Sequence, residues 1–165
     1  ADFADGFIDG FAALADAHGV ALIGGDTTRG PLAASVTVIG WVPQGAALAR
    51  AGAKIGDDVW VTGTLGDAAA ALAHDAAGAF LRERLDRPTP RAHAGIALRG
   101  IASACIDISD GLLADLGHML TMSGVGAEMD ADALPASTAL IEAVPDRDAR
   151  RALQLTGGDD YELCF

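Results

Sequence analysis

The sequence has few of the residues on which extracellular and membrane proteins depend. Only two of its 165 residues are cysteines, and neither Cys105 nor Cys164 has a partner at metal-ligand spacing, so we expect reduced thiols and no disulfide framework. Aromatic residues make up 5% of the chain, which predicts close-packed elements with few aromatic anchors. No apolar run approaches the roughly 20 residues of a membrane span, and no secretory signal pattern opens the sequence. We therefore expect a cytoplasmic protein with no membrane partner.

Basic charge is scarce as well. The formal net charge is -12, and Lys54 is the only lysine, which argues against a nucleic-acid surface because phosphate backbones require clustered Lys and Arg. The sequence contains neither GxxxxGK[ST] nor a GxGxxG that follows a strand, so the two common nucleotide fingerprints do not apply. If the protein handles phosphates, arginine, backbone N–H groups and a divalent metal held by carboxylates must bind them.

Helical and strand patterns alternate along the chain, which predicts an α/β or α+β fold with mixed sheets flanked by helices and no internal repeat. Residues 1–18 place Phe3, Phe7, Phe11 and Leu14 on one helical face, and Gly19 is a suitable stop. Further helices are expected at 66–78, 79–86, 91–101, 111–120 and within 138–153. Strands are expected at 20–25, 34–42, 57–63, 103–108, near 125–135 and from 161 onward.

The chain is also expected to divide into two domains. Pro43, Gly45 and the alanines after them form a connector, which places a boundary near residues 43–50. The sequence starts without Met and stops within the last expected strand, at "YELCF", so we expect a fragment of a longer protein.

The first candidate site is "LIGGDTTRGP", residues 22–31, where an apolar run stops at two glycines. Glycine allows the backbone to approach a ligand closely, and α/β proteins tend to place site residues at the carboxyl end of a strand. Asp26 would offer a hard oxygen ligand suited to Mg²⁺. The alternative is a turn in which a threonine caps the loop and Arg29 pairs with Asp26, and the motif alone leaves both open.

The second candidate is "DISDG", residues 107–111, between an apolar strand and an amphipathic helix. In an extended segment Asp107 and Ser109 point to the same side, and Asp110 begins the turn. The side chains thus converge at a helix N-terminus, which favours anions. The alternative is helix capping by Ser109 or Asp110. Because capping does not require Asp107, we favour a site.

The third candidate is "TGGDDYEL", residues 156–163, where glycines are again followed by acids. Asp159 and Asp160 repel each other unless a cation or a ligand donor compensates, although the segment also fits an ordinary turn. Two weaker signals could each contact phosphate: the glycine-rich "TGTLGD", residues 62–67, and Arg50. The more ordinary explanations are a helix entry for the first and a solvated surface charge for the second.

These motifs, with "GDDVWVTGTLGDAAAALA" and "RPTPR", occur in an order that resembles the thiamine-monophosphate kinase family. The family is part of a superfamily that includes aminoimidazole ribonucleotide synthetase and selenophosphate synthetase. The resemblance implies an aminoimidazole ribonucleotide synthetase-like fold and a homodimeric enzyme. It also implies Mg²⁺-assisted transfer of the γ-phosphoryl group of ATP to thiamine monophosphate. Residues 1–45 would end the N-terminal ATP-binding domain, and residues 46–165 would form most of the C-terminal domain.

The resemblance also implies roles for individual residues. The implied ATP contacts are Gly25, Asp26, Arg50 and Ser109, and the implied Mg²⁺ ligands are Asp26, Asp107 and Asp110. Asp159 would contact the thiamine substrate, at a position where relatives often carry Glu. No acid or base is expected, because the attacking phosphate oxygen is already ionised near neutral pH. Two alternatives remain open: another ATP-using enzyme of the superfamily, or a truncated, non-catalytic domain that binds nucleotide or metal.

Overall fold

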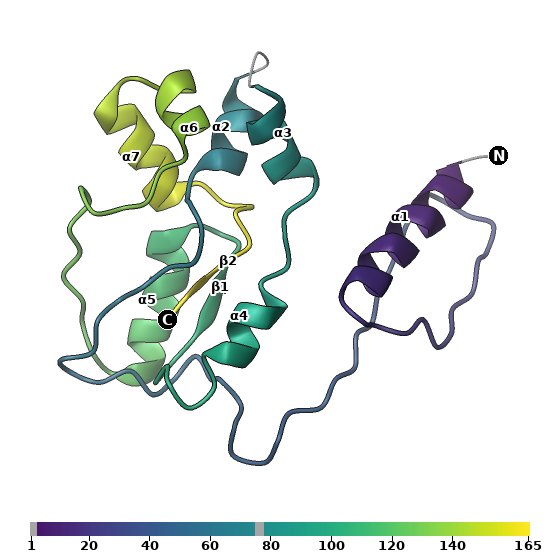
Figure 1. Ribbon diagram of the computed structural model, residues 1–165, viewed down its shortest axis with the longest axis horizontal. Coiled ribbons are helices and arrows are strands. Elements are labelled where there is room, and N and C mark those ends of the chain that lie inside the picture. The colour runs from purple at the N-terminus through teal and green to yellow at the C-terminus, as the bar shows by residue number, and fades with distance from the viewer. Residues whose placement is uncertain (1–2, 75–77) are drawn as a thin grey trace. The chain divides into compact units, whose positions relative to one another are not determined.

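The computed structural model describes residues 3–74 and 78–165. The chain divides into two compact units that meet in sequence between Trp41 and Val42. In the first unit, α1 (Phe3–Ala17) stacks the rings of Phe3, Phe7 and Phe11 along one face, with centroids 6.3 and 6.4 Å apart. The helix ends where Gly19 takes a φ of +64°, as expected of a glycine that follows a helix. The prediction of this helix is confirmed (Figure 1).

The two strands predicted in this unit, at 20–25 and 34–42, were wrong. Residues 20–28 and 33–43 carry no regular secondary structure. A strand requires hydrogen bonds from a neighbouring strand, and the backbone hydrogen bonds of these runs in the described chain are only local ones, from Val20 to Ala15 and from Ala46 to Pro43. Their apolar side chains are exposed, Ile23 to 87% and Trp41 to 93%. The apolar face of α1 is likewise unburied.

The second unit is built around a small antiparallel sheet of β1 (Ile106–Ile108) and β2 (Glu162–Cys164). The register pairs Asp107 with Leu163. Beside β2, Trp60 exchanges backbone hydrogen bonds with Phe165, and Val61 forms an isolated bridge to Cys164. The strand predicted at 57–63 is thus reduced to this bridge, whereas the strands predicted at 103–108 and from 161 are confirmed over three residues each.

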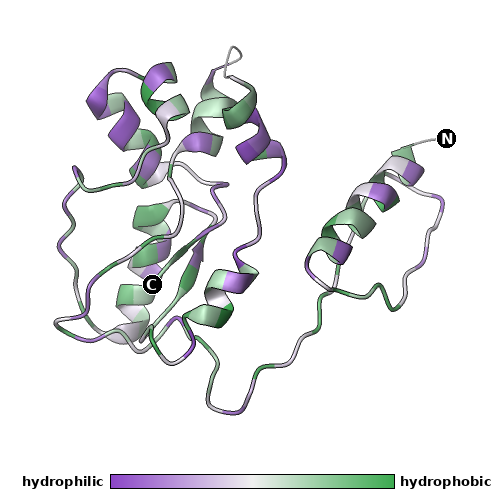
Figure 2. Cartoon of the chain, in the orientation of Figure 1, coloured by the Kyte–Doolittle hydropathy of each residue, from purple (hydrophilic) through white to green (hydrophobic). Residues whose placement is uncertain are grey.

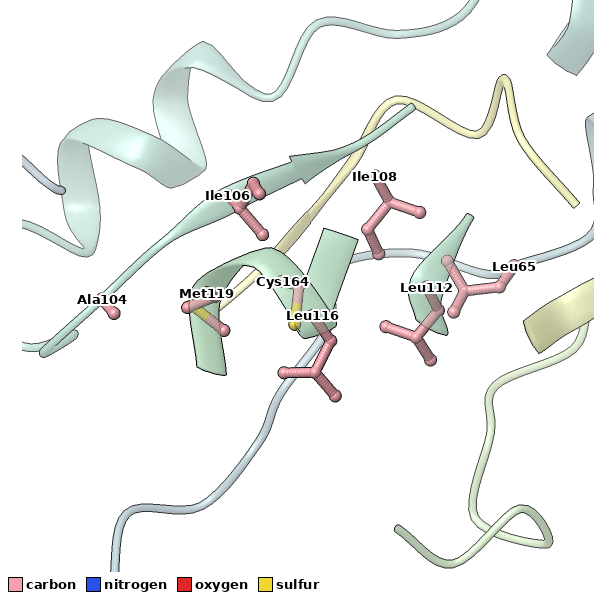
Figure 3. Close-up of a cluster of buried hydrophobic side chains, with 8 residues drawn as sticks. All are labelled: Leu65, Ala104, Ile106, Ile108, Leu112, Leu116, Met119 and Cys164. Carbon is pink, nitrogen blue, oxygen red and sulfur yellow. The ribbon is translucent and has the colours of Figure 1, made fainter. Parts of the chain in front are cut away.

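One helix, α5 (Leu112–Ser123), packs on the sheet and confirms the helix predicted at 111–120. Figure 3 shows the buried side chains between them; the cluster contains Leu65, Ala104, Ile106, Ile108, Leu112, Leu116, Met119 and Cys164. A second buried cluster joins short helices around α2 (Asp67–Ala73) and contains Ala70, Ala71, Leu81, Leu140 and Val144. The small side chains allow these helices to approach closely, as the low aromatic content predicts.

The remaining helices are α2 (Asp67–Ala73), α3 (Ala79–Asp86), α4 (Ala92–Ala97), α6 (Thr138–Ala143) and α7 (Arg147–Thr156). Each lies within or close to a predicted helical range, and the part of the 66–78 prediction at 75–77 lies outside the described residues. The strand predicted near 125–135 was wrong, because that segment has no strand. Among these short helices α2 is mostly hydrophobic, whereas α3 and α7 carry many hydrophilic residues (Figure 2). None of the helices described here is long and apolar enough to cross a membrane.

Candidate functional site

Two of the predicted motifs lie side by side at one end of the sheet. Because β1 and β2 are antiparallel, the residues that follow β1 adjoin the residues that precede β2. The N–H of Asp159 donates to the carbonyl of Ser109 at 2.9 Å, and the N–H of Tyr161 donates to the carbonyl of Ile108 at 2.8 Å. The structure therefore joins the loop at 107–111 to the loop at 156–161.

Glycines permit this close approach of the two loops. A Cβ on Gly158 would lie 2.6 Å from the carbonyl oxygen of Ser109, closer than a methyl group can approach. Gly111 has a φ of +113° and faces Thr156, whose backbone oxygen would lie 3.0 Å from an added Cβ. Both positions thus require glycine for steric reasons, and Gly111 requires it also for its positive φ.

The start of α5 differs from the capping prediction. The N-cap residue is Gly111, and neither Ser109 nor Asp110 caps the helix, so that alternative was wrong. The buried carboxylate of Asp115 instead accepts the backbone N–H groups of Ser109 and Asp110, each at 3.0 Å. A carboxylate in the first turn of a helix also interacts favourably with the helix dipole. The side chains of Ser109 and Asp110 are therefore not occupied in capping the helix and remain available for other contacts.

Arg50 lies beside Asp107 and is more than an isolated surface charge. Its Nη2 atom is 3.8 Å from Oδ1 of Asp107, and both side chains are about half exposed. Asp107 is the central residue of β1, between two buried isoleucines, so its side chain points away from the core. The pair places a cation and a carboxylate together at the edge of the sheet.

Asp107 and Asp110 supply the carboxylate oxygens of this region. Both residues are exposed, and carboxylates are the hard donors that Mg²⁺ prefers. Within the described ranges, no group of three or more His, Cys, Asp and Glu side chains is arranged to hold a metal ion. Two carboxylates nevertheless fit Mg²⁺, because this ion keeps several waters and takes further ligands from substrate phosphates.

Gly25 and Asp26 lie in the first unit, on an exposed segment without regular structure. The N–H of Thr27 donates to Oδ1 of Asp26 at 2.8 Å. The carboxylate thus contacts the backbone of the adjacent residue, without the two-residue span of the usual Asp turn. The turn and the site interpretations are compatible, because a carboxylate that accepts one N–H retains further lone pairs.

The adjacent carboxylates of Asp159 and Asp160 have different environments. Asp159 is partly exposed and takes a φ of +65°, and its Oδ1 accepts the hydroxyl of Tyr161 at 3.4 Å. Asp160 is only 2% exposed, and its Oδ2 accepts the N–H of Gly66 at 2.8 Å. The predicted repulsion is thus reduced by separating the two side chains.

Burial raises the pKa of Asp160 to about 6, and the charge of Asp67 adds to this effect. The N–H groups of Gly66 and Ala68 and the charge of Arg84 act in the opposite direction. Oδ1 of Asp160 has no hydrogen-bond partner in the described chain, so the carboxylate is only partly compensated for its loss of water.

Sequence reasoning missed a buried ionic network behind the 156–161 loop. Glu162 is fully buried and accepts hydrogen bonds from Arg84 at 2.7 Å, from Thr62 at 2.5 Å and from both Nε and Nη2 of Arg91. Burial alone would raise the pKa of Glu162, but the hydrogen bonds from Arg91 and Thr62 outweigh it and lower the pKa. The two arginines were the available signal, because few basic residues occur in this acidic chain.

Asp67 extends this network toward α2. It is fully buried, and its two oxygens accept the hydroxyls of Thr64 at 2.6 Å and of Ser137 at 2.5 Å. Arg84 Nε lies 3.6 Å from Oδ2 of Asp67. The segment at 62–67, for which the sequence favoured a helix entry over a contact with phosphate, therefore connects the loop before β2 to α2 and α3.

Comparison with known proteins gives consistent matches. The thiamine-monophosphate kinase of Salmonella typhimurium is 50% identical over 170 residues, which cover 98% of this chain and 52% of the relative. That of Escherichia coli strain K12 is 48% identical with the same coverage. The chain spans about half the length of the curated relatives it matches. No protein-family model matches.

Solved structures agree. The crystal structure of thiamine-monophosphate kinase from Stenotrophomonas maltophilia K279a superposes with a TM-score of 0.87 at 50% identity, over 98% of this chain and 55% of that one. AaThiL complexed with AMPPCP and TMP gives a TM-score of 0.64 at 35% identity, over 72% of this chain and 41% of that one. The predicted resemblance and the predicted fold class are both confirmed.

Proposed function

We propose that this chain forms part of a thiamine-monophosphate kinase, which transfers the γ-phosphoryl group of ATP to thiamine monophosphate and releases ADP and thiamine diphosphate. The observation that carries the proposal is that Arg50, the 107–111 loop and the 156–161 loop lie together at one edge of the sheet. The chain is also 50% identical to a kinase of that name. Residues 1–45 would end the ATP-binding domain, and residues 46–165 would form most of the second domain.

The nucleotide side of the proposed site follows the roles that the family resemblance implies. Gly25, Asp26, Arg50 and Ser109 would contact ATP, and Asp26, Asp107 and Asp110 would hold Mg²⁺. The donor chemistry supports this assignment, because exposed carboxylates adjoin a guanidinium group that suits phosphate oxygens. When bound, the metal neutralises charge on the phosphates and stabilises the charge that develops during phosphoryl transfer. AaThiL complexed with AMPPCP, an ATP analogue, provides a precedent in a related protein.

The chemistry requires alignment and charge neutralisation more than proton transfer. An oxygen of the acceptor phosphate forms a bond to the γ-phosphorus, and the bond from that phosphorus to the bridging oxygen of ADP breaks. Because the acceptor oxygen is already ionised near neutral pH, no general base is needed. Arg50 would offset the charge of the two polyanions, and Asp159 would hold the thiamine end of the acceptor.

We further propose that the enzyme is a cytoplasmic homodimer. Its two cysteines form no disulfide, as expected in a reducing compartment. Burial raises the pKa of the Cys164 thiol to about 12, which makes it a poor nucleophile. Exposed apolar side chains on α1, including Phe3 at 66% and Leu14 at 52%, are typical of a surface that is covered in an assembly.

A coupled assay of ADP release by the full-length gene product tests the proposed function. ATP, Mg²⁺ and thiamine monophosphate should together give ADP and thiamine diphosphate, and omission of any one should abolish the signal. A panel with aminoimidazole ribonucleotide precursors and selenide in place of thiamine monophosphate distinguishes the other superfamily activities. No ADP release with any acceptor would favour the non-catalytic alternative and contradict the proposal.

A further inference from the structure

The loop at 156–161 contains a buried carboxylate for which the proposed chemistry has no use. We propose that Asp160 is a positioning residue: by accepting the backbone N–H of Gly66, its carboxylate fixes the loop so that Asp159 faces the thiamine substrate. This inference rests on the proposed function. It assigns Asp160 a role in substrate affinity without contact to the substrate.

The hydrogen-bond donor is itself held rigidly. Gly66 is buried and adopts a φ of +87° at the N-cap of α2. An added Cβ at this position would lie 3.1 Å from the backbone nitrogen of Gln154 in α7, so α7 packs closely against the glycine. Because Gly66 cannot shift without disturbing that packing, its hydrogen bond gives Asp160 a fixed reference point in the core.

The backbone on either side of Asp160 needs such support. Asp159 and Tyr161 adopt φ values of +65° and +49°, in the left-handed region that Gly, Asn and Asp tolerate but that strains a bulky residue such as Tyr161. Strained residues of this kind persist only where the surroundings hold them. Ser109 and Ile108 hold them through backbone carbonyls, and Asp160 holds them through a side chain, which substitution can remove.

The burial of the Asp160 carboxylate also destabilises the folded state. The group is 2% exposed and has one oxygen without a partner, and burial beside Asp67 raises its pKa to about 6. Arg84 is the nearby cation that partly offsets this effect. A buried carboxylate that is retained against its own desolvation is typical of functional sites, where activity and stability conflict.

The test compares variants of the full-length gene product. Asp160→Ala removes the acceptor, whereas Asp160→Asn keeps an acceptor oxygen of the same shape for Gly66. Asp148→Ala is the matched control, because Asp148 is 90% exposed on α7. Steady-state assays give KM for thiamine monophosphate and for ATP separately, and thermal unfolding at pH 7.5 verifies that each variant is folded.

We expect Asp160→Ala to raise KM for thiamine monophosphate about tenfold, since small displacements of a positioning group are costly, with KM for ATP changed less than about twofold. Asp160→Asn should restore most of the affinity without loss of thermal stability. Equal shifts in both KM values, or no shift, would overturn the inference. If Asp160→Ala does not fold, Asp160→Ser takes its place, and failure of both would show a purely structural role. A wild-type enzyme without thiamine-dependent activity would instead overturn the proposed function.

Discussion

Nη2 of Arg50 lies 3.8 Å from Oδ1 of Asp107 across the edge of the sheet, and both side chains remain half exposed. An exposed ion pair of this kind contributes about 1 kcal/mol or less to stability. The ion pair therefore matters more for the ligands that its two groups can bind than for the stability of the fold. Together they present a cation for phosphate oxygens and a carboxylate for a metal ion at the point where the 107–111 loop begins.

Arg50→Ala should weaken nucleotide binding with little effect on stability. The guanidinium group would no longer neutralise phosphate charge, so KM for ATP should rise about tenfold, while the free energy of unfolding changes by less than about 1 kcal/mol. Arg82→Ala is the matched control, because Arg82 also forms an exposed pair, with Asp86 at 2.8 Å. Equal KM values for the two variants would contradict the assignment of Arg50.

Glu162→Gln should be strongly destabilising. The change removes the charge that compensates Arg84 and Arg91, whose side chains are only 12% and 28% exposed. Breaking a buried ion pair in this way costs about 3–5 kcal/mol, which urea unfolding of the full-length gene product measures. Glu142→Gln, on an exposed residue of α6, provides the control, and the account fails if the two variants unfold at the same urea concentration.

Asp160→Asn should change the pH dependence of stability. The folded-state pKa of Asp160 is raised from 3.8 to about 6, so the folded state binds the proton more tightly than the unfolded state between these values. Stability from this group is therefore greatest at low pH and falls as the pH rises toward 6 and above. The loss amounts to roughly 2–3 kcal/mol at most, given about 1.4 kcal/mol per pKa unit.

The Asn variant does not titrate, so its stability relative to wild type should increase between pH 4 and pH 6.5. The pKa of Glu162 is shifted in the opposite direction, because it is lowered. Glu162 therefore stabilises the fold at pH values above its ordinary pKa. This stabilisation is lost at more acidic pH in both proteins. Urea unfolding across this pH range measures the difference, with Asp148→Asn as control. A constant difference between Asp160→Asn and wild type would show that Asp160 does not titrate in this range.

Gly158→Ala should separate the two loops. The added Cβ would lie 2.6 Å from the carbonyl oxygen of Ser109, so the 156–161 loop must move, and we expect a destabilisation of about 1–3 kcal/mol together with loss of activity. Gly117→Ala is the matched control. Gly117 lies inside α5 with open space around it, and alanine there should stabilise the helix by about 0.5–1 kcal/mol. Similar effects of the two changes would contradict the contact between the loops.

Local patterns predicted the elements that depend on local physics. The helices at 3–17, 79–86 and 112–123 follow from local sequence signals, which include apolar periodicity, Gly19 as a stop for the first and "RPTPR" as a stop for the second. The strands predicted at 20–25 and 34–42 fail for the complementary reason, since a strand exists only with a partner. Hydrophobicity predicts that a segment is buried, but it does not show whether a partner strand is available to pair with it.

The candidate site shows the same division. The motifs containing Asp107 and Asp159 were found from glycines and acids in short stretches of sequence. The contact between these two motifs was not predicted, because Ser109 and Asp159 are fifty residues apart in sequence. They meet through the antiparallel register of β1 and β2. The sequence indicated Arg50 only as a weak signal and did not indicate Asp115, for a similar reason. Each side chain contacts the 107–111 loop, and the residues beside it in sequence do not reveal that contact.

The most direct test of the central claim measures thiamine diphosphate formed from ATP and thiamine monophosphate by the full-length gene product and its Asp107→Asn variant. We predict Mg²⁺-dependent product from the wild type. For the variant, we predict a kcat lower by about 100-fold or more and a higher Mg²⁺ requirement, with thermal stability unchanged because Asp107 is half exposed. No thiamine diphosphate from the wild type, or equal rates from the two proteins, would contradict the account.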